Sequence, residues 1–222
     1  MRSGRSPTGV MDQIEYGLKE NKDYNSGDIE GFSKMQVNLR EGTRFNTWMA
    51  YSKPILDNEL FEVVTGAHVA EIIVEDGVAT GVRYLQNNEL KTLKADRVVL
   101  SAGALDSPAL LMRSGIGPAE HLEEVGVEVV LDSPGIGENL HDHYLVPVIA
   151  EATKREIDAP RDTVSVAQTH WFAYSRDDVH SPDTQPLNFA VPMYQDGMSG
   201  PTNAFTLQAG VVGTRSRGTL RL

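Results

Sequence analysis

The sequence predicts a mixed α/β (α+β) protein, and three observations lead to this fold class. Residues 97–117 combine a short β-branched run with a small-residue turn, a helix and a glycine stop. Residues 67–93 alternate apolar and polar side chains between turn signals, which is typical of a β-meander. Beyond Tyr144, strand-like segments alternate with long polar connections, and this pattern predicts a second, antiparallel sheet.

Composition narrows the class of protein. The chain has 222 residues, 40% of them hydrophobic, so a folded protein with one large domain or parts of two is expected. A net charge of −11 argues against a nucleic-acid or anionic-membrane partner. The absence of cysteine excludes disulfides and thiolate chemistry. No stretch is apolar enough to span a membrane and no secretory signal is found, so we expect a cytoplasmic protein.

The first half of the chain predicts two helices, a strand and the meander. The helices are expected over residues 10–19 and over residues 44–55, the second packing Phe45, Trp48 and Met49 and ending near Pro54. A strand is expected over residues 32–39. Turn signals at Glu75-Asp76-Gly77 and at residues 86–89 divide the meander. Its expected strands are residues 60–65, 67–74, 79–85 and 90–93.

Residues 97–117 predict a ligand-binding edge. Val98 to Leu100 read as a buried strand of a parallel sheet, and the small residues Ser101 to Ala104 let a ligand approach the backbone. Asp106 or Ser107 is expected to cap the next helix, with Pro108 in its first turn. Gly115 is expected to end it in the left-handed conformation.

After Gly117 the pattern predicts a helix over residues 119–125, a strand over 127–131 and a loop over 132–143. Residues 154–183 show no strong periodicity. The strands expected in the second sheet are residues 145–150, 187–193, 204–212 and 219–222.

The tripeptide His141-Asp142-His143 is the most chemically suggestive motif. It supports either an active-site imidazole or a loop held by local hydrogen bonds. A metal site is not favoured, because no third ligand is evident nearby. The glycine pairs at 115/117 and 135/137 are expected to be turns rather than phosphate loops. From the residues alone, a reaction does not follow.

Residues 97–117, followed by GENLHDH at 137–143, resemble the glucose–methanol–choline (GMC) family of FAD-dependent oxidoreductases. The segments DYN, GTRFNTWMAY, LFEVVTGAHVAEIIVEDGVATGVRY and SRGTLRL occur in the family's order. The resemblance implies a two-domain flavoenzyme. Residues 1–143 would form most of this portion of the FAD-binding domain, and residues 144–222 part of a substrate-binding domain with an antiparallel sheet.

The resemblance also implies which residues meet FAD. The backbone of Val69 would lie against the adenine end, and Ser101, Ala102 and Gly103 would pass along the cofactor. Asn139, Asp142 and His143 match the loop that closes over the flavin, and His143 would line the active site.

Leu145 is expected to affect the choice of substrate. It occupies the position at which choline-oxidising members of the family carry a glutamate that holds the trimethylammonium group. An apolar side chain cannot pair with a cation, so choline is expected to be a poor substrate.

Two parts of the family pattern are absent from this sequence: the N-terminal GxGxxG unit and the block that carries the general-base histidine. The catalytic residue is therefore unknown. The sequence predicts an internal segment of an oxidoreductase that acts on the CH–OH group of alcohols, with hydride transfer to flavin N5. The segment alone is expected neither to hold FAD nor to react. A hydroxynitrile lyase of the same fold and a non-catalytic remnant are the alternatives, and the electron acceptor is left open.

Overall fold

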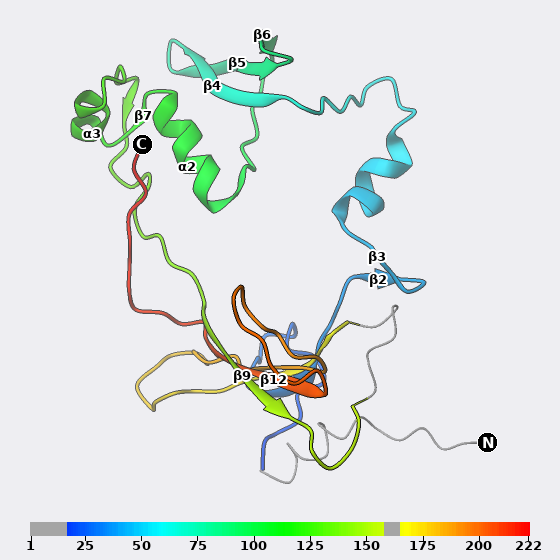
Figure 1. Cartoon of the computed structure of the whole chain (residues 1–222). Coiled ribbons are helices and arrows are strands. Elements are labelled where there is room, and N and C mark those ends of the chain that lie inside the picture. The colour runs from blue at the N-terminus through cyan, green and yellow to red at the C-terminus, as the bar shows by residue number, and fades with distance from the viewer. Residues whose placement is uncertain (1–16, 158–164) are drawn as a thin grey trace. The chain divides into compact units, whose positions relative to one another are not determined.

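The computed structural model describes residues 17–157 and 165–222, which fall into two compact units (Figure 1). The first unit contains residues up to Leu56 together with Asp142–Arg215, and the second contains Asp57–His141 with Ser216–Leu222. The predicted mixed α/β class is confirmed. The helix expected over residues 10–19 falls mostly outside the described residues. The division at residue 143 into cofactor and substrate domains stays a prediction.

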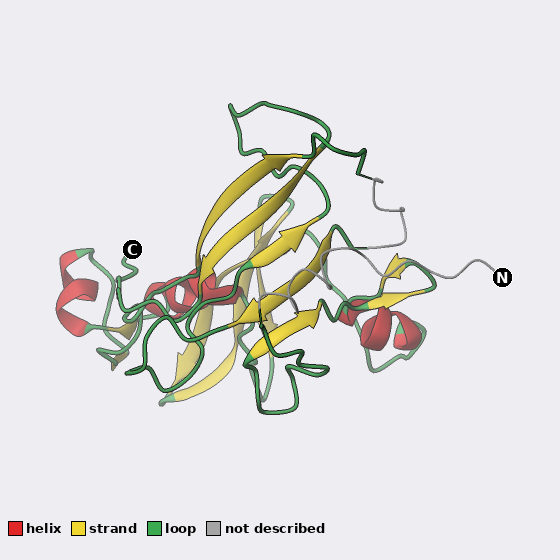
Figure 2. Cartoon of the chain, turned by 90° about the horizontal axis from the view of Figure 1, so that it is seen from below, coloured by secondary structure: helices red, strands yellow, loops and turns green. Residues whose placement is uncertain are grey.

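The first unit is built on a five-stranded antiparallel sheet in the order β1-β10-β11-β12-β9. Figure 2 draws the strands of the chain as yellow arrows. β9 and β12 pair along their whole length and confirm two predicted strands. β11 is shorter than its predicted range of 187–193. The bounds are Gly31–Lys34 for β1, Tyr144–Glu151 for β9, Ala167–Phe172 for β10, Leu187–Phe189 for β11 and Ala204–Val211 for β12.

β10 lies in the region where the sequence predicted no element. Its neighbouring residues Thr169 and His170 are both buried, at 3% and 1% exposure. Successive side chains of a strand point to opposite faces, so both faces of β10 are covered and its sequence has no polar–apolar alternation. The missing periodicity is therefore a consequence of two-sided burial.

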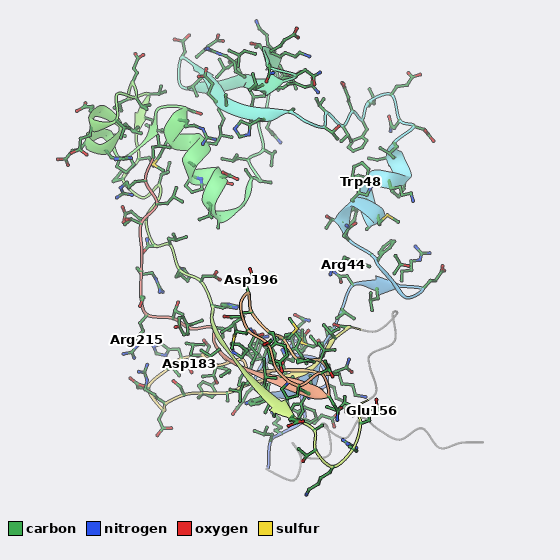
Figure 3. All side chains as sticks on the ribbon, in the orientation of Figure 1. Arg44, Trp48, Glu156, Asp183, Asp196 and Arg215 are labelled. Carbon is green, nitrogen blue, oxygen red and sulfur yellow. The ribbon has the colours of Figure 1, made fainter. Side chains whose placement is uncertain are left out.

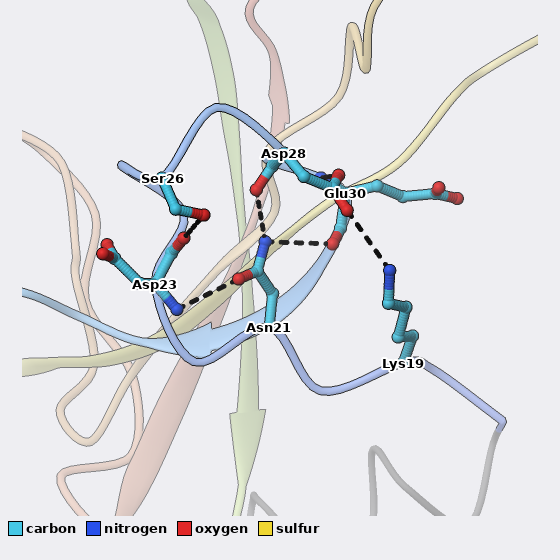
Figure 4. A network of polar contacts seen from close by, with 6 residues as sticks. All are labelled: Lys19, Asn21, Asp23, Ser26, Asp28 and Glu30. Atoms are coloured by element: carbon cyan, nitrogen blue, oxygen red, sulfur yellow. Dashed lines mark hydrogen bonds and ion pairs between the residues drawn. The ribbon is translucent and has the colours of Figure 1, made fainter.

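A network of polar contacts orders the loop before β1 (Figure 4). The side-chain amide of Asn21 donates to the carbonyls of Asp28 at 2.7 Å and Glu30 at 3.2 Å, while its oxygen accepts the Asp23 N–H. Lys19 pairs with the Asp28 carboxylate at 3.2 Å on the surface. The backbone carbonyl of Asn21 accepts the hydroxyl of Ser33, which ties the loop to the sheet.

A hairpin and two helical turns follow β1. The predicted strand over residues 32–39 forms only in part, as β1, and its end begins the hairpin of β2 (Leu39–Arg40) and β3 (Thr43–Arg44). The helix predicted over residues 44–55 forms only the π-helical turn η1 (Trp48–Ser52) and the 3₁₀ turn η2 (Lys53–Ile55). Neither turn contains a buried residue, and Trp48, labelled in Figure 3, is exposed, so its predicted packing is wrong. Phe45, which lies before both turns, and Met49 are half-buried.

The second unit opens with the predicted meander. Asp76 and Gly77 in one turn, and Asn87 and Asn88 in the other, all have positive φ, as two-residue hairpin turns require. The strand predicted over residues 60–65 is wrong: the segment is a loop without a paired neighbour, and Leu60 is 97% exposed. The strands of the meander are β4 (His68–Glu75), β5 (Val78–Gln86) and β6 (Glu89–Lys94).

Helix α2 (Gly103–Arg113) starts earlier than predicted. Its N-cap is Ala102, so neither Asp106 nor Ser107 caps it, and Pro108 lies inside the helix rather than in the first turn. Gly115 has a φ of 79°, which confirms the predicted left-handed stop.

The strand predicted at Val98–Leu100 is also wrong. These residues have no ladder partner among the described strands, and Val99 is 79% exposed. A strand needs a hydrogen-bonded neighbour, which composition alone does not supply.

The last part of the second unit is a small parallel pair. β7 (Ile116–Gly117) and β8 (Leu131–Asp132) are joined through α3 (Ala119–Glu124), which confirms the predicted helix. The strand predicted over 127–131 is wrong except for its last residue, Leu131, which belongs to β8. The strand predicted over 219–222 does not form. In residues 17–157 and 165–222, no helix is long and apolar enough to cross a membrane.

Candidate active-site cavity

A cavity of about 380 Å³ lies within the second unit, between the N-terminal half of α2 and the loop of residues 135–141, here called the cavity loop. Apolar side chains make up much of the lining, and polar groups are few, a composition typical of small-molecule sites. The lining residues are Ala104, Ser107, Pro108, Leu111, Gly135, Ile136, Gly137, Glu138, Asn139, Leu140, His141 and Leu220.

The α2 wall exposes backbone at the start of the helix. No side chain caps the helix at Ala102, although the Ala102 N–H donates to the hydroxyl of Ser107 at 3.1 Å. Gly103 has a φ of 91°, and no atom lies within 4 Å of the position that a Cβ there would take. A ligand can therefore approach this backbone closely, and the positive end of the helix dipole faces outward here.

The cavity loop is held by the segment of residues 216–222, here called the C-terminal clasp. Leu140 and Gly218 form an antiparallel bridge with N–H···O distances of 2.9 and 2.7 Å. The Leu220 N–H donates to the Gly137 carbonyl at 2.7 Å. Gly137 has a φ of 80°, and a Cβ at that position would collide with the Leu220 carbonyl. The close approach of the two segments thus requires glycine.

Two further contacts extend the clasp. Arg221 forms an ion pair with Glu138, and the Leu222 N–H donates to Nε2 of His121 on α3 at 3.2 Å. The clasp therefore links the cavity loop to a helix. This bracing holds one wall of the cavity in place before any ligand arrives.

The polar groups of the cavity loop are oriented by its backbone. Asn139 adopts a φ of 62°, unusual for a residue other than glycine. Its carbonyl oxygen lies 2.6 Å from Nδ1 of His141. The carboxylate of Glu138 faces Arg221 and is neutralised by it.

The structure brings only some of the predicted site residues together. Asn139 lines the cavity. Ser101 to Gly103 come directly before the lining residue Ala104 and do not line the cavity themselves. Val69 is half-buried in β4, opposite Tyr84 in β5, and does not line the cavity.

Asp142 and His143 lie in the first unit, at the start of its second segment. The Asp142 carboxylate accepts the His143 N–H at 2.7 Å. His141 and Asp142 therefore both make short local hydrogen bonds, which supports the interpretation of the tripeptide as a braced loop.

Several lining residues were not expected from the sequence. Ser107 was considered only as a helix cap, and Leu111 has the pattern of an ordinary core-facing helix residue. Leu220 lines the cavity because the C-terminal clasp contacts the cavity loop. One of these contacts joins Arg221 to Glu138, which are 83 residues apart in sequence. No local signal identifies such a residue.

The first unit contains a separate buried imidazole. His170 is 1% exposed, with the Tyr24 ring 4.3 Å and the Phe172 ring 5.1 Å from its own ring, centroid to centroid. Its Nδ1 lies 2.9 Å from the side-chain amide of Gln185. Burial lowers the pKa of His170, because the charged ring would lose its hydration. Among the described residues, no group of three or more histidine or acidic side chains is placed to hold a metal.

Fold and cavity together define a mixed α/β protein with a cavity of small-molecule size beside the N-terminal half of a helix. The chain belongs to the GMC oxidoreductase family, whose model matches residues 13–145. The family resemblance of the sequence is thereby confirmed, and with it FAD as the cofactor of the family.

Relatives and solved structures agree with this assignment. Choline oxidase from Arthrobacter globiformis is 34% identical over 98% of this chain and 42% of its own length. An alcohol dehydrogenase (acceptor) from Pseudomonas putida is 35% identical over 68% of this chain and 28% of its own length. The crystal structure of pyridoxine 4-oxidase from Mesorbium loti matches 96% of this chain and 42% of that chain, with a TM-score of 0.84 and 28% identity. The chain thus spans less than half the length of these relatives.

Proposed function

We propose that this chain is part of an FAD-dependent oxidoreductase that acts on the CH–OH group of alcohols. Family membership and relatives named as choline oxidase and alcohol dehydrogenase support the reaction class. When bound, FAD accepts the hydride that leaves the alcohol carbon. The observation that carries the proposal is the braced cavity between α2 and the cavity loop, because these are the two segments whose sequences resemble the family most closely.

The residues of the cavity fit part of FAD. Its volume of about 380 Å³ is near the lower end of the range for small-molecule sites, about 300–1,000 Å³, so it has room for a portion of a dinucleotide. Gly103 lies directly before the lining residue Ala104, and the open space at its Cβ position leaves the backbone there accessible to a ligand. Much of the lining is apolar, and Ser107, Asn139 and His141 supply polar groups.

The remaining assignments follow the family pattern. We place Val69 at the adenine end of FAD, Ser101 to Gly103 along the cofactor, and Asn139 and Asp142 in the loop over the flavin. His143 would line the substrate site. In this proposal residues 1–143 belong mostly to the FAD-binding domain and residues 144–222 to the substrate-binding domain, whose antiparallel strands the first unit contains.

The proposed substrate is a small neutral alcohol. Leu145 lies on β9, opposite Gly210 of β12, and offers no charge to a cationic substrate. The electron acceptor is oxygen or another molecule. We place the protein in the cytoplasm, with no nucleic-acid partner, in keeping with its net charge of −11.

Anaerobic reduction of the full-length protein tests the proposal. The purified protein is expected to carry FAD, and a primary alcohol is expected to bleach the flavin absorbance. A full-length protein that neither carries nor takes up FAD would overturn the proposal. Bound flavin that no alcohol bleaches, in a protein that cleaves hydroxynitriles, would identify a lyase instead.

A further inference from the structure

The hydrogen bond between His141 and Asn139 fixes the tautomer of the imidazole. The Nδ1 atom lies 2.6 Å from the Asn139 carbonyl oxygen. A carbonyl oxygen can only accept, so Nδ1 must carry the proton. In the neutral ring, Nε2 then has a free lone pair and acts as an acceptor.

The backbone around His141 holds this arrangement. Asn139 has a φ of 62°, and Leu140 is bridged to Gly218 on both its N–H and its carbonyl. His141 lines the cavity, and within the described part of the chain no hydrogen bond to its Nε2 is found. The acceptor is therefore presented by a braced loop and is available to a ligand.

The opposite wall presents a second acceptor. An α-helical carbonyl normally accepts the N–H of the fourth residue after it. For Ala104 that residue is Pro108, which has no N–H, and both residues line the cavity. The Ala104 carbonyl thus lacks its usual helical partner. The cavity thus has acceptors on two walls, and the carboxylate of Glu138, another lining residue, is paired with Arg221.

We propose that His141 binds a hydroxyl group of FAD, accepting its hydrogen bond at Nε2. This inference rests on the proposed function. Hydroxyl groups donate, whereas phosphate oxygens are acceptors and would face the lone pairs of Nε2 and of the Ala104 carbonyl. The Nε2 acceptor of His141 is therefore matched to a hydroxyl group of the cofactor, either in the ribityl chain or in the ribose.

Two substitutions separate the roles of the two ring nitrogens. His141→Asn keeps a donor near the Nδ1 position and removes the Nε2 acceptor, while His141→Gln places an amide oxygen near the Nε2 position. In the full-length apoprotein, titrated with FAD and followed by flavin fluorescence, His141→Asn is expected to weaken binding about tenfold. His141→Gln is expected to stay within about twofold of the wild type.

The source of the hydroxyl is tested with riboflavin and AMP as separate probes. Weaker riboflavin binding by His141→Asn assigns the ribityl chain, and weaker AMP binding assigns the ribose. Unchanged binding of FAD and of both probes would overturn the inference while leaving the proposed function intact. A wild-type protein that binds no FAD would instead overturn the proposed function, and this inference with it.

An independent readout is the ring itself. In protein labelled with ¹⁵N-histidine, the neutral His141 ring is expected to carry its proton on Nδ1 before FAD is added. A ring protonated on Nε2 alone would contradict the inference whatever the affinities are.

Discussion

The hydroxyl of Ser114 accepts the backbone N–H of Ile72 at 2.8 Å and so joins the end of α2 to β4. The same hydroxyl donates to the Leu110 carbonyl at 2.7 Å. Ser114 is 8% exposed, as is Ile72, so both hydrogen bonds are shielded from water. One side chain therefore satisfies a strand amide and a helix carbonyl at the contact that positions the α2 wall.

Replacing Ser114 by alanine is expected to destabilise the second unit by about 1–3 kcal/mol, because the buried Ile72 N–H loses its acceptor. Faster hydrogen exchange at the Ile72 amide is the direct measurement. Ser26→Ala serves as the control, since the Ser26 hydroxyl also donates to a carbonyl but at an exposed position. Unchanged Ile72 protection in the Ser114 variant would contradict the assigned hydrogen bond.

Gly115→Ala and Gly126→Ala form a matched pair at the ends of α2 and α3. Both glycines have positive φ, 79° and 75°, so alanine costs roughly 1 kcal/mol of backbone strain at each. At Gly115 the new Cβ would also collide with the Glu128 carbonyl and lie 2.7 Å from a Val130 methyl, whereas at Gly126 the space is open. Denaturant titration should therefore show a clearly larger loss for Gly115→Ala. Equal losses would mean that the turn at Gly115 is not as tight as described.

A second glycine pair tests the cavity loop. Gly137→Ala places a Cβ against the Leu220 carbonyl and is expected to push the clasp away, lowering FAD retention by the full-length protein. Gly135→Ala is the control: it lines the same cavity, has no positive φ, and has nothing within 4 Å of its Cβ position. Flavin content per polypeptide after purification is the measurement. If the two variants retain FAD equally, the clasp does not shape the cofactor site.

Burial of His170 predicts a loss of stability in mild acid. Its pKa is lowered in the folded protein, so below the ordinary value of about 6.5 the unfolded chain binds more protons than the folded one. The contribution of the neutral His170 ring to stability is therefore fully present above pH 6.5 and is lost as the pH drops from 6.5 through the lowered pKa. Asp23, Asp28 and Asp183 also have lowered pKa values, starting from 3.8, and stay ionised in this window.

His170→Phe provides the control for this pH dependence, because phenylalanine fills the aromatic cluster and does not titrate. Chemical unfolding of both proteins is measured at pH 7.5 and pH 5.5, about one unit on either side of 6.5. The loss of free energy of unfolding between the two pH values is then compared for the two proteins. The variant should show the smaller loss. Identical losses would place the acid-sensitive group elsewhere.

Leu145→Glu is expected to raise the kcat/KM for choline, relative to that for a neutral primary alcohol, by at least about tenfold. The reason is the added carboxylate, which can pair with a trimethylammonium group. Leu145→Gln has nearly the same shape without the charge and should leave the ratio unchanged. Efficient choline turnover by the wild-type full-length enzyme would show that Leu145 does not limit the substrate.

The sequence predicted the fold best where the chemistry is local. Asp76-Gly77 and Asn87-Asn88 adopt the positive φ that their residue types favour, and Gly115 ends α2 for the same reason. The strand predicted at Val98–Leu100 failed because a strand needs a hydrogen-bonded partner, and none is found among the described residues. β10 escaped detection because His170 and its neighbour are buried on opposite faces, which removes the alternation that identifies a strand.

The site divides in the same way. Asn139 was found through a family resemblance carried by consecutive residues, and the structure places it in the cavity. Leu220 was not found, because its role comes from pairing with Gly137, and nothing in a run of Thr, Leu and Arg indicates that contact. The tautomer of His141 likewise depends on a carbonyl direction set by the backbone of Asn139.

The bridge between the cavity loop and the clasp also has a consequence for biosynthesis. Arg221 pairs with Glu138 across 83 residues, so the ribosome makes the loop long before it makes the partner. Domains generally fold as they emerge, and contacts distant in sequence form late. The meander and α2 can therefore assemble early, whereas the loop wall waits for the last residues of this segment. The FAD site proposed at this wall is therefore expected to be completed only after the clasp has been synthesised.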